Sequence, residues 1–132
     1  MQRTFLSTAC LLAATAVLLG AMGAHFLKEK MTADYLTSFE TGLRFQFYHA
    51  LALLLVGILM RDVKNKFIKW SAQSFIAGII FFSGSLYLLS IHELIGMENY
   101  KWLGPITPLG GLCFTAVWIF LFMAVRKKST MS

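Results

Sequence analysis

The stretch Arg44-Phe-Gln-Phe-Tyr-His49-Ala-Leu-Ala-Leu-Leu-Leu-Val-Gly-Ile-Leu-Met60 constrains how the whole chain can fold. It is apolar enough to cross a bilayer, yet it begins with an arginine and contains a glutamine and a histidine. Polar side chains at membrane depth are costly unless other protein groups bond them. Because lipid satisfies neither side of such a helix, we predict that it lies in the centre of a bundle or against a second subunit.

The composition of the chain is typical of a membrane protein. Of its 132 residues, 58% are hydrophobic and 14% are charged, and the mean hydropathy is +0.69. A spanning helix needs about 20 apolar residues to cross about 30 Å of hydrocarbon, and the chain contains four such runs. We therefore predict an all-α integral membrane four-helix bundle that forms a single transmembrane domain over residues 1–132.

Four helices are expected, at about residues 5–26, 37–60, 68–91 and 108–125. The first run also resembles a signal peptide, because small residues between Ala21 and Ala24 resemble a cleavage site. We favour a retained helix, since the run is long enough to span and the next helix needs a packing partner. Asp34 and Thr37 are candidate caps of the second helix, and Pro108 suits the first turn of the fourth.

Basic residues are distributed unequally between the two ends of the expected bundle. Roughly eight lysines and arginines flank the end that carries both termini, and roughly four flank the other end. By the positive-inside rule, both termini are expected in the cytoplasm. The net charge of +6 is explained by this topology and by anionic lipid. Nucleic-acid binding is not expected, because no aromatic and basic face joins the clusters.

Polar side chains within the spans gather in the half of the membrane away from the termini. At about 1.5 Å per helical residue, His49 lies near mid-membrane, and Ser83, counted from an apolar start at Ser71, lies at nearly the same depth. These two side chains are therefore expected to meet. The candidate members of an outward-facing polar pocket are His25, Arg44, Gln46, His49, Ser83, Ser85, Tyr87 and Thr107.

Each of these residues also has a structural interpretation. His49 is expected first of all to tie helices together, with proton handling or ligand binding as the alternative. Arg44 has Glu40 four residues before it, the spacing of an interfacial ion pair. Haem ligation by His25 and His49 is disfavoured by their different depths. No metal site or cofactor is predicted, and without a nucleophile triad, paired carboxylates or a phosphate loop, no enzymatic activity is predicted either.

Small residues at helical spacing predict where helix backbones approach closely. Three of them lie three and four residues apart at the end of the first run, and others flank the serines of the third helix and open the fourth. The residues expected at helix contacts are Gly20, Gly23, Ala24, Gly84, Gly110 and Gly111.

Four short stretches resemble a known family when they are taken together and in this order. They are Leu19-Gly-Ala-Met-Gly-Ala-His-Phe26, Phe45-Gln-Phe-Tyr-His-Ala-Leu-Ala-Leu-Leu54, Phe82-Ser-Gly-Ser-Leu-Tyr-Leu88 and Ile106-Thr-Pro-Leu-Gly-Gly111. The chain resembles the YgdD/YwdK-like small membrane proteins of unknown function (domain of unknown function 423, UPF0382), to which the animal transmembrane protein 256 is related. The resemblance implies a multi-pass protein of the plasma membrane, the bacterial inner membrane, with its first segment retained. Val117 departs from the family pattern, in which a glycine is usual.

Two classes of function follow. The first is a non-enzymatic accessory or stabilising component of a membrane assembly or of the cell envelope, with the lipid bilayer and other membrane subunits, or a second copy, as partners. The alternative is a module that binds or transports a lipid or a small solute through the outward polar pocket. In that case we expect oligomers, because four helices are few for a pore, and His49 offers a proton-linked step.

Overall fold

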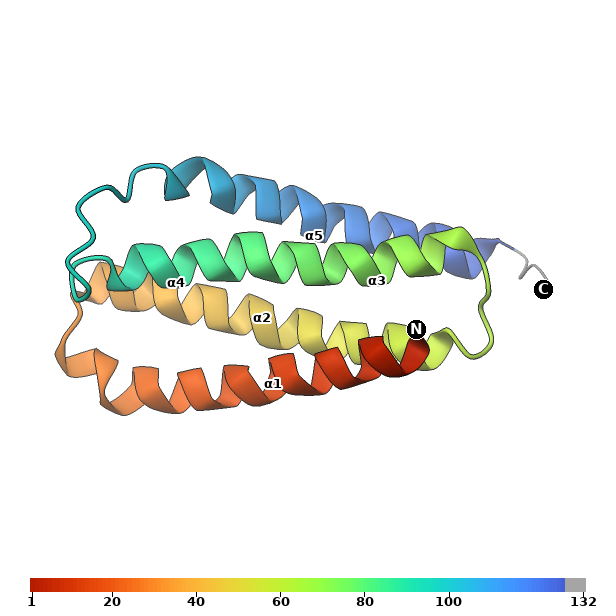
Figure 1. Ribbon diagram of the computed structural model, residues 1–132, viewed down its shortest axis with the longest axis horizontal. Coiled ribbons are helices and arrows are strands. Elements are labelled where there is room, and N and C mark those ends of the chain that lie inside the picture. The colour runs from red at the N-terminus through yellow and green to blue at the C-terminus, as the bar shows by residue number, and fades with distance from the viewer. Residues whose placement is uncertain (128–132) are drawn as a thin grey trace.

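The chain folds into long helices that run back and forth along one axis (Figure 1). The structure is a computed structural model that describes residues 1–127. Its elements in chain order are α1 (Gln2–His25), the 3-10 turn η1 (Leu27–Glu29), α2 (Ala33–Leu59), α3 (Lys66–Gly78), the π-helical turn η2 (Ile79–Ser83), α4 (Gly84–Ile91) and α5 (Leu103–Arg126).

These elements form four membrane spans, because α3, η2 and α4 continue one another as a single helix, Lys66–Ile91. All four are long and apolar enough to cross a membrane, and no strand occurs in residues 1–127. The prediction of an all-α, four-helix membrane protein is confirmed.

The second helix starts earlier than its expected caps. Thr32 is the N-cap, and its side chain accepts a hydrogen bond from the Tyr35 N–H at 3.4 Å. Asp34 lies in the first turn and Thr37 lies further inside the helix, where its hydroxyl donates to the Ala33 carbonyl at 2.9 Å. The expectation that Asp34 or Thr37 caps this helix is wrong, because Thr32 already satisfies a free N–H of the first turn.

The fourth helix also starts earlier, at Leu103. Pro105 lies in its first turn, where a missing N–H costs little, whereas Pro108 lies inside the helix. Pro108 leaves the Gly104 carbonyl without its helical partner. Gly104 is exposed near the end of the helix, where water can bond that carbonyl, so the helix continues through the proline.

The helices are arranged in the order α1, α2, α3–α4, α5 across the view of Figure 1. α1 packs mainly against α2, and α5 packs mainly against α3 and η2, while α2 also packs against α3, η2 and α4. In the most apolar window of each span, 44% of the residues are buried in α2, against 17% in α1 and 22% in α5. The prediction of a central second helix is confirmed.

The main apolar cluster lies in one half of the bundle, whereas most of the buried polar side chains lie in the other half. We call the end with Met1, the α2–α3 connection and Arg126 the terminal end, and the opposite end the far end (Figure 1). The buried apolar core lies in the half nearer the terminal end and consists of Phe5, Ala9, Ala52, Leu53, Val56, Ile68, Ala72, Phe75, Val117 and Ala124. Hydrogen bonds between helices occur in both halves, for example from Ser71 to the Val117 carbonyl and from Ser83 to the Gly42 carbonyl.

Gly110 of α5 lies close to the backbone of the π-helical turn. A Cβ built on Gly110 would lie 2.6 Å from the Cα of Phe82, well inside van der Waals contact. The next residue, Gly111, has open space where its Cβ would be. Because successive helical residues point about 100° apart, Gly110 faces η2 and Gly111 does not, although both were expected at a helix contact.

The small residues of α1 behave in the same selective way. A Cβ on Gly20 would lie 3.2 Å from Leu43, and one on Gly23 would lie 2.9 Å from Phe39, so both glycines face α2. Ala24 is exposed and lies one residue further round the helix. Gly20 and Gly23 therefore form the expected contact with α2, and Ala24 does not take part in it.

Gly84 is open on the side where its Cβ would be, which differs from the expectation that it packs against a neighbouring helix. Its neighbours Ser83 and Ser85 bond to α2 and α5 respectively, and Gly84 points about 100° away from each. Three other glycines have side chains of neighbouring helices where a Cβ would be, and sequence reasoning did not single them out: Gly42, Gly57 and Gly78.

Candidate functional site

Gln46 joins three helices through one side chain. Its Nε2 donates to the Leu12 carbonyl at 2.8 Å and to the Thr15 hydroxyl at 2.9 Å, both on α1. Its Oε1 accepts from the Tyr87 hydroxyl of α4 at 2.5 Å. Both amide hydrogens and one carbonyl lone pair are therefore used, and the structure brings together two of the candidate pocket residues, Gln46 and Tyr87.

Ser83 at the end of the π-helical turn and Ser85 at the start of α4 tie the third span to the helices on either side. The Ser83 hydroxyl donates to the Gly42 carbonyl of α2 at 2.6 Å. The Ser85 hydroxyl donates to the Phe82 carbonyl at 2.9 Å and lies 2.6 Å from the Thr107 hydroxyl of α5. Either hydroxyl can donate in this bond, because each also has a backbone carbonyl within reach, that of Phe82 for Ser85 and that of Leu103 for Thr107.

His49 is held in one neutral tautomer by its two partners. Its Nδ1 lies 2.8 Å from the Phe45 carbonyl, which only accepts, so Nδ1 carries the hydrogen. Its Nε2 lies 3.3 Å from the Trp118 indole nitrogen, which only donates, so Nε2 accepts. The ring also stacks on Phe114 of α5, with centroids 3.6 Å apart. His49 therefore links α2 to α5 as a neutral imidazole.

We expect nitrogen NMR of the protein in lipid bilayers at neutral pH to show this tautomer directly. Histidine labelled at both ring nitrogens should give, for His49, a protonated Nδ1 and an unprotonated Nε2. In Trp118→Phe, which keeps an aromatic ring but removes the N–H, the Nε2 resonance should move because its donor is lost. A protonated Nε2 in the unmodified protein would contradict this assignment.

His49 and Ser83 do not meet, contrary to expectation. His49 packs against Phe75, whereas Ser83 bonds to Gly42, two helical turns away from His49. The reason lies at the start of the third span, which begins at Lys66 rather than near Ser71. The extra helical residues place Ser83 more than a turn further from the terminal end than the apolar count predicts.

His25 and Arg44 lie apart from these hydrogen-bonded groups. Both are exposed, His25 at the last residue of α1. Arg44 donates a hydrogen bond to the Thr41 hydroxyl at 3.4 Å. This bond, to the residue that follows Glu40, replaces the expected ion pair between Arg44 and Glu40. Positions three and four before an arginine are both within its reach on a helix, and an exposed ion pair stabilises too little to decide between them.

The candidate residues are thus divided among separate contacts rather than gathered around one hollow. Arg44 lines an apolar groove of about 280 Å³ between α1 and α2. Tyr87 lines another of about 240 Å³ between α1, α2 and α4. Gln46, Ser83, Ser85 and Thr107 are bonded across helix contacts, as described above. Within residues 1–127, no group of three or more histidine, cysteine or acidic side chains lies close enough to hold a metal ion.

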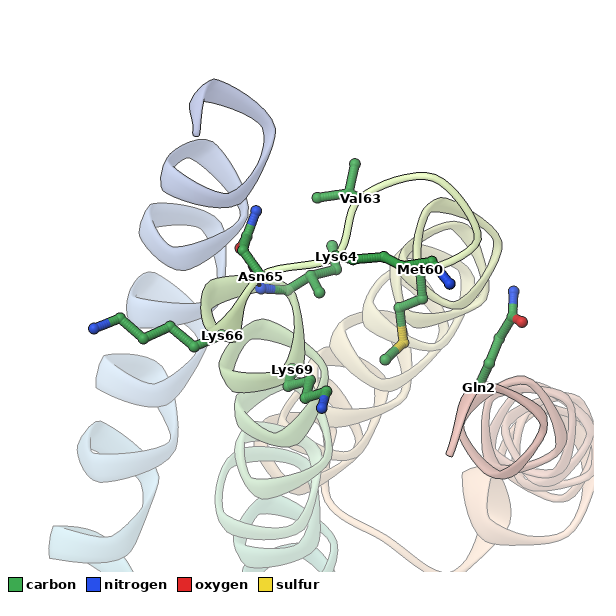
Figure 2. A pocket seen from close by; sticks show the side chains of 8 residues that line it. Gln2, Met60, Val63, Lys64, Asn65, Lys66 and Lys69 are labelled. Atoms are coloured by element: carbon green, nitrogen blue, oxygen red, sulfur yellow. Dashed lines mark hydrogen bonds between the residues drawn. The ribbon is translucent and has the colours of Figure 1, made fainter. Parts of the chain in front are cut away.

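A larger hollow at the terminal end was not expected from the sequence as a binding site. Its volume is about 490 Å³, and Figure 2 shows it between the ends of α1, α2 and α3. The residues that line it are Gln2, Met60, Val63, Lys64, Asn65, Lys66, Ile68 and Lys69.

The far end has an aromatic cluster around a second buried histidine. The His92 ring stacks on Tyr100 at 3.9 Å between centroids and meets Tyr35 edge to face at 5.1 Å. Its Nδ1 lies 2.6 Å from the Leu89 carbonyl. The expected helices leave Tyr35, His92 and Tyr100 outside the spans, in two different connections, and their spacing gave no signal that they would meet.

Comparisons with known proteins agree with this membrane architecture. Residues 19–111 match the family described as "Protein of unknown function (DUF423)". A UPF0382 membrane protein of Staphylococcus aureus (strain bovine RF122 / ET3-1) is 40% identical over 126 residues, or 96% of this chain and 98% of the relative. The UPF0382 membrane protein YwdK of Bacillus subtilis (strain 168) is 37% identical over 127 residues, again 96% and 98%. No solved structure matches the chain. The resemblance found in the four motifs is confirmed, and the chain belongs to the DUF423 (UPF0382) family of membrane proteins.

Proposed function

We propose that this protein is a non-enzymatic, multi-pass protein of the bacterial plasma membrane that stabilises a larger membrane assembly or the cell envelope. The observation that carries the proposal is the internal use of its polar residues. In residues 1–127, every buried side-chain nitrogen or oxygen has a hydrogen-bond partner. Gln46, Ser83 and His49 all serve contacts between helices, which is how a rigid scaffold satisfies polar groups in lipid.

The exposed faces of the two outer helices support a role in assembly. Leu11 and Leu18 on α1 are 68% and 66% exposed, and Leu112 and Phe122 on α5 are 67% and 62% exposed. In a membrane these faces are covered either by lipid or by another chain. We propose that other membrane subunits, or a second copy of this protein, cover part of them.

The proposed orientation places both termini in the cytoplasm. Support comes from the basic residues at the terminal end, where the α2–α3 connection contributes Arg61 and Lys64 and the start of α3 adds Lys66. Cytoplasmic flanks of spans carry an excess of lysine and arginine. In a variant with Cys10 and Cys113 replaced by alanine, an added cysteine at Lys30 should react with an impermeant maleimide in intact cells. One at Arg61 should react only after lysis, and the reverse result would contradict the orientation.

The alternative of a transport module receives less support. A solute site would present several polar groups to one shared space, whereas Gln46 and Tyr87 bond to each other and His49 bonds to Trp118. A flux assay in liposomes is the matching test. Movement of a solute that depends on Gln46 would favour transport over the accessory role.

The accessory role is tested by extracting the protein from its own membrane into native nanodiscs and weighing the particles by native mass spectrometry. We expect a second chain at a fixed ratio to this one. A photo-crosslinking residue in place of Leu18 or Leu112 should then yield a defined adduct that identifies it. The unsubstituted protein under the same irradiation is the control. Single, bare chains in every preparation would contradict the proposal.

A further inference from the structure

We propose that the hollow at the terminal end binds the phosphate headgroup of an anionic phospholipid. Its position is the first argument. The hollow lies where the apolar part of α2 ends at Met60, and Trp70, one turn into α3, is 42% exposed. An exposed tryptophan beside the end of a span is typical of the level of the lipid headgroups.

The walls of the hollow fit the two parts of a phospholipid. Met60, Val63 and Ile68 contribute apolar side chains to its lining, while Lys64, Lys69 and the amide of Gln2 provide donors. Gln2 uses one amide hydrogen to bond the Gly57 carbonyl at 2.8 Å, which fixes its position and leaves the other hydrogen for a ligand. A lining that combines apolar side chains with donors suits the ester region of a lipid together with its phosphate.

The donors come from three different elements. Gln2 belongs to α1, Lys64 to the α2–α3 connection and Lys69 to α3 (Figure 2). In Figure 2 Lys64 extends toward the α1 side, where Gln2 lies. A headgroup held by all three joins the ends of both hairpins, α1–α2 and α3–α5, at the membrane surface.

Lys66 is directed to the other side of α3. Its ammonium lies 5.2 Å from the ring centre of Trp70, and Trp70 packs against Phe120 of α5. Figure 2 shows the side chain pointing away from Gln2 and Lys64. The ligand-facing charge is therefore supplied by Lys64 and Lys69, with Lys66 only contributing to the wall.

The electrostatic surroundings favour an anion. The terminal end carries seven basic residues in the described part of the chain against the single carboxylate of Asp62: Arg3, Arg61, Lys64, Lys66, Lys69, Arg126 and Lys127. Basic pockets between spans at the membrane surface bind anionic headgroups. A zwitterionic headgroup brings a cationic amine into the same field and is disfavoured.

The test measures lipid binding to the purified full-length protein by native mass spectrometry from detergent. Dioleoyl phosphatidylglycerol should bind in preference to dioleoyl phosphatidylcholine. In the variant Lys64→Gln/Lys69→Gln, its affinity should fall by about 30-fold, or about fivefold for each lysine near the surface. Lys64→Arg/Lys69→Arg should retain binding, because arginine also pairs with phosphate. Retention by the arginine variant shows that the position tolerates substitution and that charge is what matters.

Arg126→Gln/Lys127→Gln is the matched control, because it removes the same charge from the same end but outside the hollow. It should keep most of the preference for phosphatidylglycerol. An equal loss in both double variants would overturn the site in favour of general surface attraction, as would the absence of any preference in the unmodified protein. Inorganic phosphate should not displace the lipid at millimolar concentration. Full displacement would make free phosphate the ligand and would overturn the lipid assignment.

Discussion

Replacing Gly110 with alanine is expected to lower the free energy of unfolding by about 2 kcal/mol. The added methyl group would lie 2.6 Å from the Cα of Phe82, so it meets backbone rather than the movable end of a side chain. Helix propensity alone would favour alanine by about 1 kcal/mol, but the two helices must separate to admit the methyl group. Separation would also strain the bond between Ser85 and Thr107, which joins α4 to α5 beside this contact.

Gly111→Ala is the matched control for this prediction. It makes the same change one residue later, where the added methyl group would have open space. We expect it to be neutral or stabilising by up to about 1 kcal/mol. The free energies of unfolding of the two variants are compared in lipid bilayers, with steric trapping as the measurement of reversible unfolding. Equal effects at the two positions would show that α5 does not approach the π-helical turn as closely as the structure has it.

Gln46→Leu is expected to destabilise the fold by about 2 kcal/mol. The substitution removes the hydrogen bonds to Leu12, Thr15 and Tyr87, and hydrogen bonds between membrane helices contribute about 0.6 kcal/mol each on average. The Tyr87 hydroxyl then also remains buried without its acceptor, which adds to the loss. The same unfolding measurement in bilayers checks the value.

Two further variants separate the contributions at this site. Tyr87→Phe removes one of the three bonds, and combining it with Gln46→Leu should show a coupling of about 0.6–1.7 kcal/mol between the two positions. Gln73→Leu makes the same substitution at an exposed position of α3 and should change stability little. If Gln73→Leu cost as much as Gln46→Leu, the effect would come from the loss of a polar side chain rather than from the bonds between helices.

Hydrogen bonds between helices stabilise both halves of the bundle. Near the terminal end, apolar side chains such as Leu53 and Phe75 fill the core, and the Ser71 hydroxyl of α3 donates to the Val117 carbonyl of α5. In the far half, Gln46 and Ser83 donate to backbone carbonyls of neighbouring helices in the same way. Lipid offers no hydrophobic driving force between helices, so such bonds and close glycine contacts contribute along the whole bundle.

The number and the order of the spans were predictable from the sequence. Each span is a local run of apolar residues whose length matches the bilayer, and hydropathy depends on composition alone. The central position of α2 was predictable as well, because a helix with Gln46 and His49 on one face and Arg44 on another cannot be satisfied by lipid on either side. The position of most polar residues in the far half was also predictable, because the number of residues from the end of a span gives the depth of each side chain.

The partners of those polar residues were decided by the tertiary structure. One residue along a helix changes depth by about 1.5 Å and direction by about 100°, so an early start of α3 at Lys66 moved Ser83 from His49 to Gly42. The π-helical turn η2 lies where Gly110 of α5 approaches it closely, and no local pattern in the sequence indicated it. The sequence alone thus determined that this is a four-helix membrane protein with a polar far half. Only the relative rotation and depth of the helices decided that Gln46 meets Tyr87, that Trp118 fixes the tautomer of His49 and that lysines from separate elements surround one hollow.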